Sequence, residues 1–166
     1  MTENLLKRED TYKAEISSAT NAIRHILNMH DVLLSHKKRM ISEMIWKITE
    51  GDGLNPAEKI TGLLYKKNIT YISESVKKRR DGGNYDIADL RHEHVYMRKG
   101  LVDRLLSNPM GISNVLKNTI GCVVTEKEHD SLPHKGLDGW DRYKKAKIRI
   151  WNTRTKTWEL DYKDFN

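Results

Sequence analysis

Four of the seven histidines lie between residues 92 and 134, and three other side chains capable of chemistry lie among them. The set is His92, His94, His129 and His134, with Glu93, Asn118 and Cys122. Imidazole accepts or donates a proton near neutral pH. Imidazole and carboxylate groups are also competent ligands for divalent metal ions. The sequence therefore predicts a site in this stretch, either catalytic or metal-binding.

The first group of these residues, His92-Glu93-His94, is followed by Val95-Tyr96-Met97, and the pattern alternates like a short strand. On a strand His92 and His94 share one face, and Glu93 points to the other. The two histidines are candidate ligands for a divalent ion, with His129 or His134 completing the site. A purely structural role, with each imidazole satisfied by backbone partners, explains the pair as well. Both interpretations stay open.

The order of residues from about 92 to 130 resembles the core of the HNH (His-Me finger) nucleases. Glu93-His94 lies on the first expected strand, Asn118 precedes the second, and His129 follows on a helix. The resemblance implies that His94 is the general base and that Asn118 orients it. It also implies that Glu93 and His129 hold a divalent cation (Mg, Mn or Zn). His92, one of the two histidines on the strand, is a further candidate ligand from the spacing alone. The implied reaction is metal-assisted phosphodiester hydrolysis.

The charge balance favours an acidic partner. Thirty Lys and Arg stand against 23 Asp and Glu, giving a net charge of +7 and a pI of about 9.4. The cations gather in three clusters: Lys77, Lys78, Arg79 and Arg80; Arg98 and Lys99; and Arg142, Lys144, Lys145, Lys147 and Arg149. The third is interleaved with Trp140, Tyr143 and Trp151, and aromatic rings can stack on unpaired bases.

These features predict a nucleic-acid-associated protein, with DNA and RNA both open. Its sharpest form is a metal-dependent endonuclease. The alternative is a non-catalytic regulator or inhibitor that grips nucleic acid or a nucleoprotein complex. For each basic cluster the competing interpretation is a solvated helix face.

The first half of the chain is expected to be helical. Apolar residues recur at three- and four-residue steps over 16–34 and again over 40–48, as in amphipathic helices. Two short helices are expected between 55 and 80. The first begins at Asn55-Pro56, and the second ends at the basic run 77–80. The N-terminal helices can pair in a homodimer or cover the rest of the chain.

The second half is expected to be mixed. Strands are predicted near 92–97 and 120–124, and near 148–152 and 156–160, where Trp151 and Trp158 can pair across a hairpin. Helices are predicted over 99–107 and 111–117, and after a capping box formed by Thr125 and Glu128. The fold class is α+β and mostly helical, with a small antiparallel β element. Regions 1–84 and 85–166 are expected to form one integrated domain.

The cysteine content, the lengths of the apolar runs and the N-terminal residues bear on the cellular compartment. One cysteine excludes an intrachain disulfide, and Cys122 lies in an apolar strand, where it is expected to be a core residue. No apolar run approaches the roughly 18 to 20 residues of a membrane span. The N-terminus begins with polar residues of mixed charge, unlike a secretion signal. The sequence predicts a cytoplasmic protein with no membrane partner.

Overall fold

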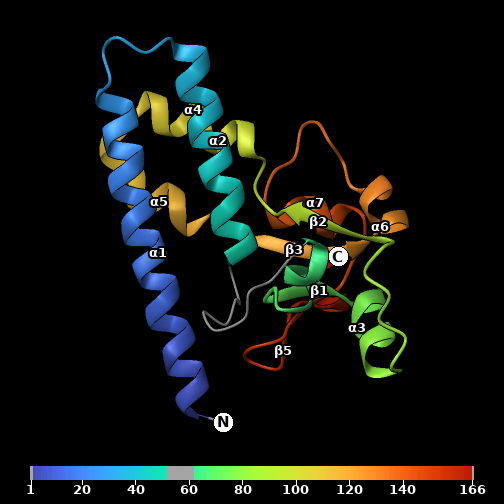
Figure 1. The fold of residues 1–166 in the computed structure, drawn as a ribbon. Coiled ribbons are helices and arrows are strands. Elements are labelled where there is room, and N and C mark those ends of the chain that lie inside the picture. The colour runs from blue at the N-terminus through green and yellow to red at the C-terminus, as the bar shows by residue number, and fades with distance from the viewer. Residues whose placement is uncertain (1, 52–61, 166) are drawn as a thin grey trace.

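The structure is a computed structural model, and it describes residues 2–51 and 62–165 (Figure 1). Two long helices, α1 (Thr2–Asn28) and α2 (Leu34–Gly51), form an antiparallel hairpin. They pack with α4 (Arg98–Ser107) and α5 (Ile112–Lys117). A sheet lies beside this bundle, and it carries the remaining helices α3 (Glu74–Asp81), α6 (Glu126–Ser131) and α7 (Trp140–Lys145).

The sheet has five strands: β1 (Tyr71–Ser73), β2 (Leu90–His94), β3 (Gly121–Thr125), β4 (Ile150–Asn152) and β5 (Thr157–Leu160). Their order is β2-β3-β1-β4-β5, with β1 and β3 parallel and the other pairs antiparallel. The α+β class and the helical N-terminal half are confirmed. The expectation of a small antiparallel element was wrong, because β1 joins the β2–β3 pair to the β4–β5 hairpin. A three-residue strand is too short to show alternation in the sequence.

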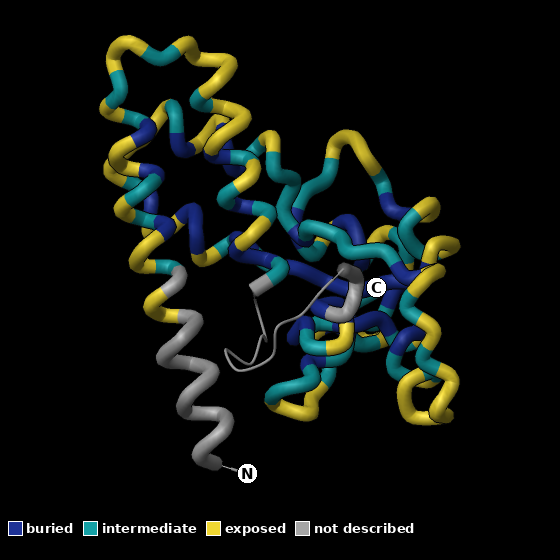
Figure 2. Tube along the Cα trace, in the orientation of Figure 1, coloured by how far each residue is buried: buried dark blue, intermediate teal, exposed yellow. Residues whose placement is uncertain are grey.

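The helical layer has its own apolar core. Ile23 and Ile26 of α1 meet Ile41 and Ile45 of α2, and α4 adds Leu101. All five side chains are buried, so the 3.6-residue spacing turns each apolar stripe toward the neighbouring helices. Buried and exposed stretches alternate along the helices of this layer in Figure 2. The stripe of α1 is thus covered by the chain itself, and a homodimer through these helices stays a prediction. No helix in the described residues is long and apolar enough to cross a membrane.

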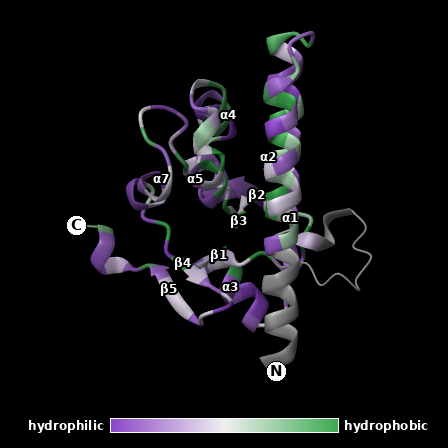
Figure 3. Cartoon of the chain, turned by 90° about the vertical axis from the view of Figure 1, so that its left-hand side faces the viewer, coloured by the Kyte–Doolittle hydropathy of each residue, from purple (hydrophilic) through white to green (hydrophobic). Residues whose placement is uncertain are grey.

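The hairpin's tip departs from the expected pattern. The stripe was expected to continue to Leu34, but α1 ends at Asn28, and Leu33 and Leu34 are 66% and 59% exposed. The amides of His36 and Lys37 bond to the carbonyl of Leu33, so these two leucines lie at the turn into α2. Apolar and polar residues mix along α2 itself (Figure 3). The three- and four-residue spacing of apolar residues continues past the end of α1 into the turn, so the prediction that Leu33 and Leu34 belong to the buried stripe was wrong.

Two further cores lie on the two sides of the sheet. Cys122, Val124 and Tyr143 belong to one, and Ile72 and Val123 belong to the other. Cys122 is fully buried, and burial raises the pKa of its thiol well above the ordinary value, so its core role is confirmed. The predicted hairpin is also confirmed in β4 and β5. Trp151 pairs with Trp158, with ring centroids 5.0 Å apart.

Several short elements agree with the sequence patterns. The Thr125–Glu128 capping box is present at α6, and α4 ends before Asn108-Pro109 as predicted. Ser73 caps α3, and its hydroxyl also donates to Glu128 Oε2 at 2.6 Å, which ties the two helix starts together. The helix start expected at Asn55-Pro56 lies outside the described residues. Residues 62–67 form a 3-10 helix, and α7 was not expected.

Candidate functional site

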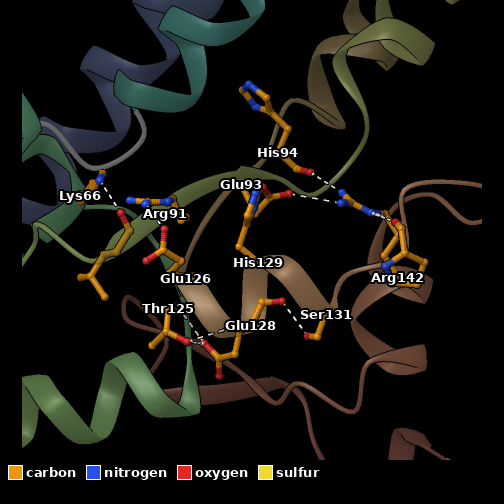
Figure 4. A network of polar contacts seen from close by, with 12 residues as sticks. Lys66, Arg91, Glu93, His94, Thr125, Glu126, Glu128, His129, Ser131 and Arg142 are labelled. Carbon is orange, nitrogen blue, oxygen red and sulfur yellow. Dashed lines mark hydrogen bonds and ion pairs between the residues drawn. The ribbon is translucent and has the colours of Figure 1, made fainter.

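Strand β2 divides the candidate site residues between its two faces. His94 points toward the helical layer, whereas Glu93 lies on the other side of the strand with His129 (Figure 4). The pairing of β2 with β3 keeps this alternation regular, since Glu93 is opposite Cys122 and His94 is opposite Gly121. The predicted alternation is confirmed, and it means that Glu93 and His94 serve two different environments.

The histidine face is aromatic. The Trp46 ring of α2 lies 5.1 Å from the His92 ring and 4.9 Å from the His94 ring, between centroids. His92 Nδ1 lies 3.2 Å from the Tyr65 hydroxyl, and His94 Nδ1 lies 3.3 Å from Thr49 Oγ1. Thr49 Oγ1 already donates to the Trp46 carbonyl, so it can only accept from His94. His94 therefore carries its proton on Nδ1.

Both imidazoles are held neutral. Burial lowers the pKa of His92 to about 4 and that of His94 to about 3, and neighbouring cations such as Arg98 act in the same direction. The Nε2 atoms of both rings are buried, and among residues 2–51 and 62–165 neither has a hydrogen-bond partner. The residue that the nuclease resemblance names as general base is thus an enclosed, weakly basic side chain.

The opposite face is charged and connected. Glu93 Oε1 lies 2.6 Å from His129 Nδ1 on α6, and Glu93 Oε2 accepts from Arg142 on α7 at 3.3 Å. Arg142 is buried, and it also donates to the carbonyls of His94, at 3.0 Å, and Pro133, at 2.9 Å. One guanidinium therefore fixes the carboxylate, the end of β2 and the segment after α6 at once (Figure 4).

This arrangement prepares His129 for proton transfer. A carboxylate only accepts hydrogen bonds, so the contact with Glu93 places the imidazole proton on Nδ1 and leaves Nε2 with a free lone pair. The His129 side chain is 34% exposed, so a substrate can approach it. A carboxylate that holds an imidazole in one tautomer and orientation is the support a general base needs.

The same contacts do not fit a divalent cation. Both oxygens of Glu93 are engaged, and one of them faces a guanidinium, which repels a metal ion. The described residues contain no group of three or more His, Cys, Asp or Glu side chains able to hold a metal. The structure brings together Glu93 and His129 from the proposed ligand set and places His92 on the opposite face. Among the described contacts, none joins Asn118, at the end of α5, to His94 or Glu93.

Most of the predicted basic residues are neutralised within the chain. Ion pairs join Lys77 to Asp81, Lys78 to Glu74 and Arg79 to Asp89. The third cluster is engaged as well: Arg142 with Glu93, Lys144 with Asp141, and Arg149 with Glu74 and Asp161. Arg149 also lies 3.7 Å from the Trp158 ring centroid. Arg80, Lys145 and Lys147 are exposed and have no ion pair among the described residues.

The second predicted cluster, Arg98 and Lys99, lines a groove between α2 and α4 together with two cations of α2. Its walls are Lys38, Arg39, Ser42, Arg98, Lys99, Val102 and Asp103. Asp103 is the one acid there, and it pairs with Lys38 at 3.1 Å. Arg98 lies 4.8 Å from the Trp46 ring centroid, and among the described residues neither Arg39 nor Lys99 has an ion pair.

The sequence interpretation contained half of this groove. The sequence predicts Arg98 and Lys99 as binding residues but not Lys38 and Arg39, although these two lie in the basic run His36-Lys37-Lys38-Arg39. That run was the available signal. Its proximity to Arg98, some 60 residues later in the chain, depends on how α2 packs on α4 and has no signature in a single sequence.

No protein-family model matches the chain, and no curated protein or solved structure is significantly similar to it. What the protein does is therefore inferred from its own residues and their geometry.

Proposed function

We propose that the protein binds nucleic acid and holds the phosphate backbone in the groove between α2 and α4. The observation that supports this is the charge of the groove, where four cations face one carboxylate. With Lys38 paired to Asp103, three cations are left for an external anion: Arg39, Arg98 and Lys99. Two of these are arginines, whose planar guanidinium matches a phosphate with two parallel hydrogen bonds.

Repeated anions suit this groove better than a single one. Cations from two different helices line opposite walls, so a chain of phosphates can contact both. Each neutralised phosphate releases counterions, and this gives binding that weakens steeply with salt. The cluster at 77–79 is a weaker candidate, because each of its cations already has a carboxylate partner.

Binding of labelled single-stranded RNA and DNA, measured by fluorescence anisotropy from about 50 to 200 mM salt, tests this proposal. The test variant replaces Arg39, Arg98 and Lys99 with Gln. The control variant replaces Lys77, Lys78 and Arg79 with Gln, and removes the same charge from positions already paired with acids.

We expect the groove variant to lose about two units from the slope of log K against log salt, because each single-strand contact contributes roughly 0.7. Its affinity at low salt should fall about 10- to 100-fold, while the control changes little. Equal losses in the two variants would show a response to bulk charge alone and would exclude the groove. An affinity of the unaltered protein that does not respond to salt would exclude binding through the phosphate backbone, and no measurable affinity would exclude nucleic-acid binding altogether.

A second candidate function is phosphodiester cleavage, which the pairing of Glu93 with His129 favours. The two residues are brought from different elements to 2.6 Å, and Arg142 holds the carboxylate in place. Degradation of RNA or plasmid DNA that is lost in His129→Asn would support it. Degradation that persists unchanged in that variant would assign any cleavage to other residues.

A further inference from the structure

The segment between α6 and α7 adds a second imidazole to the charged face of β2. The His134 ring lies 6.1 Å from the His129 ring, between centroids, and the two planes are tilted by 65°. His134 is exposed, as are its neighbours Lys135 and Gly136. Glu93 contacts His129, and in the part of the chain that the structure describes it makes no contact with His134. The two imidazoles therefore differ: one is oriented by a carboxylate, and the other is open to solvent.

This segment is fixed at both ends. Arg142 Nε donates to the carbonyl of Pro133 at 2.9 Å, directly before His134. At the other end, Asp138 Oδ1 accepts from the backbone amide of Met97 at 2.7 Å, and Asp138 Oδ2 pairs with Arg104 at 3.2 Å. His134 thus lies on a short projection between two anchored points.

The second anchor also links this projection to the basic groove. Met97 is the N-cap of α4, and Arg98 and Lys99 of the groove follow it directly. Asp138 therefore docks the His134 segment against the same helix end that carries the groove's cations. The segment that carries His134 and the cations Arg98 and Lys99 thus meet at the N-terminal end of α4.

We propose that His129 and His134 form an acid–base pair that cleaves RNA by transfer of the phosphate to the adjacent 2′-hydroxyl. His129 Nε2 takes the proton of the 2′-hydroxyl, whose oxygen forms a bond to phosphorus. The bond from phosphorus to the 5′-oxygen breaks, and protonated His134 donates the proton that this leaving oxygen needs. The products are a 2′,3′-cyclic phosphate and a 5′-hydroxyl, with no water, metal or redox partner consumed.

The geometry suits this reaction because the base and the acid must each come within about 3 Å of a different oxygen of one phosphodiester. Two rings 6.1 Å apart can approach the phosphate from two sides. Glu93 is a positioning residue, since it fixes the tautomer that leaves Nε2 of His129 free. The 2′-hydroxyl supplies the nucleophile, so RNA and not DNA is the substrate class.

The inference rests on the proposed nucleic-acid binding, and one experiment separates the two. The substrate is a labelled DNA oligonucleotide that contains a single ribonucleotide, with the all-DNA and the 2′-O-methyl versions as matched controls. The full chain is incubated with each in EDTA or in magnesium, and binding is recorded in the same samples. His134→Ala is the test variant, because the side chain is exposed and its loss leaves the interior unchanged. His25→Ala, an exposed histidine of α1, is the control.

We expect cleavage only after the ribonucleotide, resistant to EDTA, with a cyclic phosphate identified by mass spectrometry. His134→Ala should reduce the rate about 10²- to 10⁴-fold, as expected for loss of a general acid, and His25→Ala should not. The rate should show a bell-shaped pH profile, and His134→Ala should remove its alkaline limb.

Cleavage that requires magnesium, or cleavage of the 2′-O-methyl substrate, would overturn the transfer mechanism. Binding without any cleavage would overturn the acid–base pair and leave the proposed function intact. An absence of binding to every oligonucleotide would overturn both.

Discussion

The two faces of β2 offer opposite solutions for polar side chains on one strand. On one face His92 and His94 lie among aromatic rings, and each has a buried Nε2 with no hydrogen-bond partner among the residues that the structure describes. On the other face Glu93 has both oxygens engaged, and its partner His129 reaches solvent. The first face lowers the free energy of unfolding, because a buried polar atom without a hydrogen-bond partner is destabilising. The second is satisfied internally and presents one reactive nitrogen outward.

The comparison shows why adjacency in sequence is a poor guide to a shared site. Glu93 and His94 are consecutive, yet they are separated by the plane of the sheet (Figure 4). Glu93 instead works with His129 and Arg142, which lie 36 and 49 positions later in the chain. The strand's two-residue period sets this partition.

The largest expected loss of stability follows from removing Arg142, which lies at the centre of the charged face of β2. Arg142→Met removes the guanidinium that Glu93, His94 and Pro133 share, and it leaves a largely enclosed carboxylate without its cation. We expect a loss of about 3–5 kcal/mol in the free energy of unfolding, measured by urea denaturation. Lys144→Met, on the same helix but half exposed and paired only with Asp141, should cost less than about 1 kcal/mol. Similar losses in both variants would contradict a central role for Arg142.

Arg142 also shows what the sequence could and could not reveal. The sequence predicts it as part of a basic cluster for nucleic acid, because Lys144, Lys145 and Lys147 follow it. Its burial depends on α7, a six-residue helix that is too short to be predicted from a periodic pattern in the sequence. Elements with strong local signals were predicted well, such as the Thr125–Glu128 capping box and the tryptophan hairpin. Features set by long-range pairing, such as β1 beside β3 and the α2–α4 groove, leave no local signal.

The histidine face should reveal itself through pH. The pKa values of His92 and His94 are lowered from 6.5 to about 4 and about 3, so the unfolded chain binds more protons than the folded protein below pH 6.5. The contribution of these two histidines to the free energy of unfolding is therefore fully present above about pH 6.5, and it is lost as the pH falls toward 4. With two groups, the slope approaches about 2.7 kcal/mol per pH unit.

Urea denaturation between pH 7.5 and 4.5, followed by tryptophan fluorescence, measures this slope. His94→Gln should reduce it by about half, because one of the two depressed pKa values is gone. Mutation of the exposed His30 to Gln should leave the slope unchanged. A slope that His94→Gln does not alter would place the acid sensitivity elsewhere in the protein.

Two glycines test how firmly the His134 segment is held on the charged face. Gly139 has φ +64°, and an added Cβ would lie 2.6 Å from Tyr96 Cε1, whereas Gly136 has φ +78° and open space around it. Positive φ costs Gly136→Ala about 1 kcal/mol. Gly139 combines φ +64° with ψ −149°, a conformation essentially restricted to glycine, and Gly139→Ala adds a clash with Tyr96. We expect a total of about 2–3 kcal/mol for Gly139→Ala, from thermal denaturation. Equal costs would mean that the segment moves away from Tyr96 freely.

The smallest expected effect concerns Arg98, which lies where the histidine face of β2 meets the basic groove. Arg98 lies 4.8 Å from the Trp46 ring centroid, and that ring covers both histidines, whereas the neighbouring Lys99 has no described contact with the ring. Arg98→Gln should lower the free energy of unfolding by about 0.5–1 kcal/mol, the usual size of a cation–π contact, and Lys99→Gln should not. Both changes should weaken nucleic-acid binding to a similar extent, because each removes one cation from the same groove. A stability loss confined to Arg98→Gln, with a binding loss in both variants, would show two roles for Arg98. Its guanidinium stabilises the Trp46 ring that covers the histidines, and its charge contributes to anion binding in the groove.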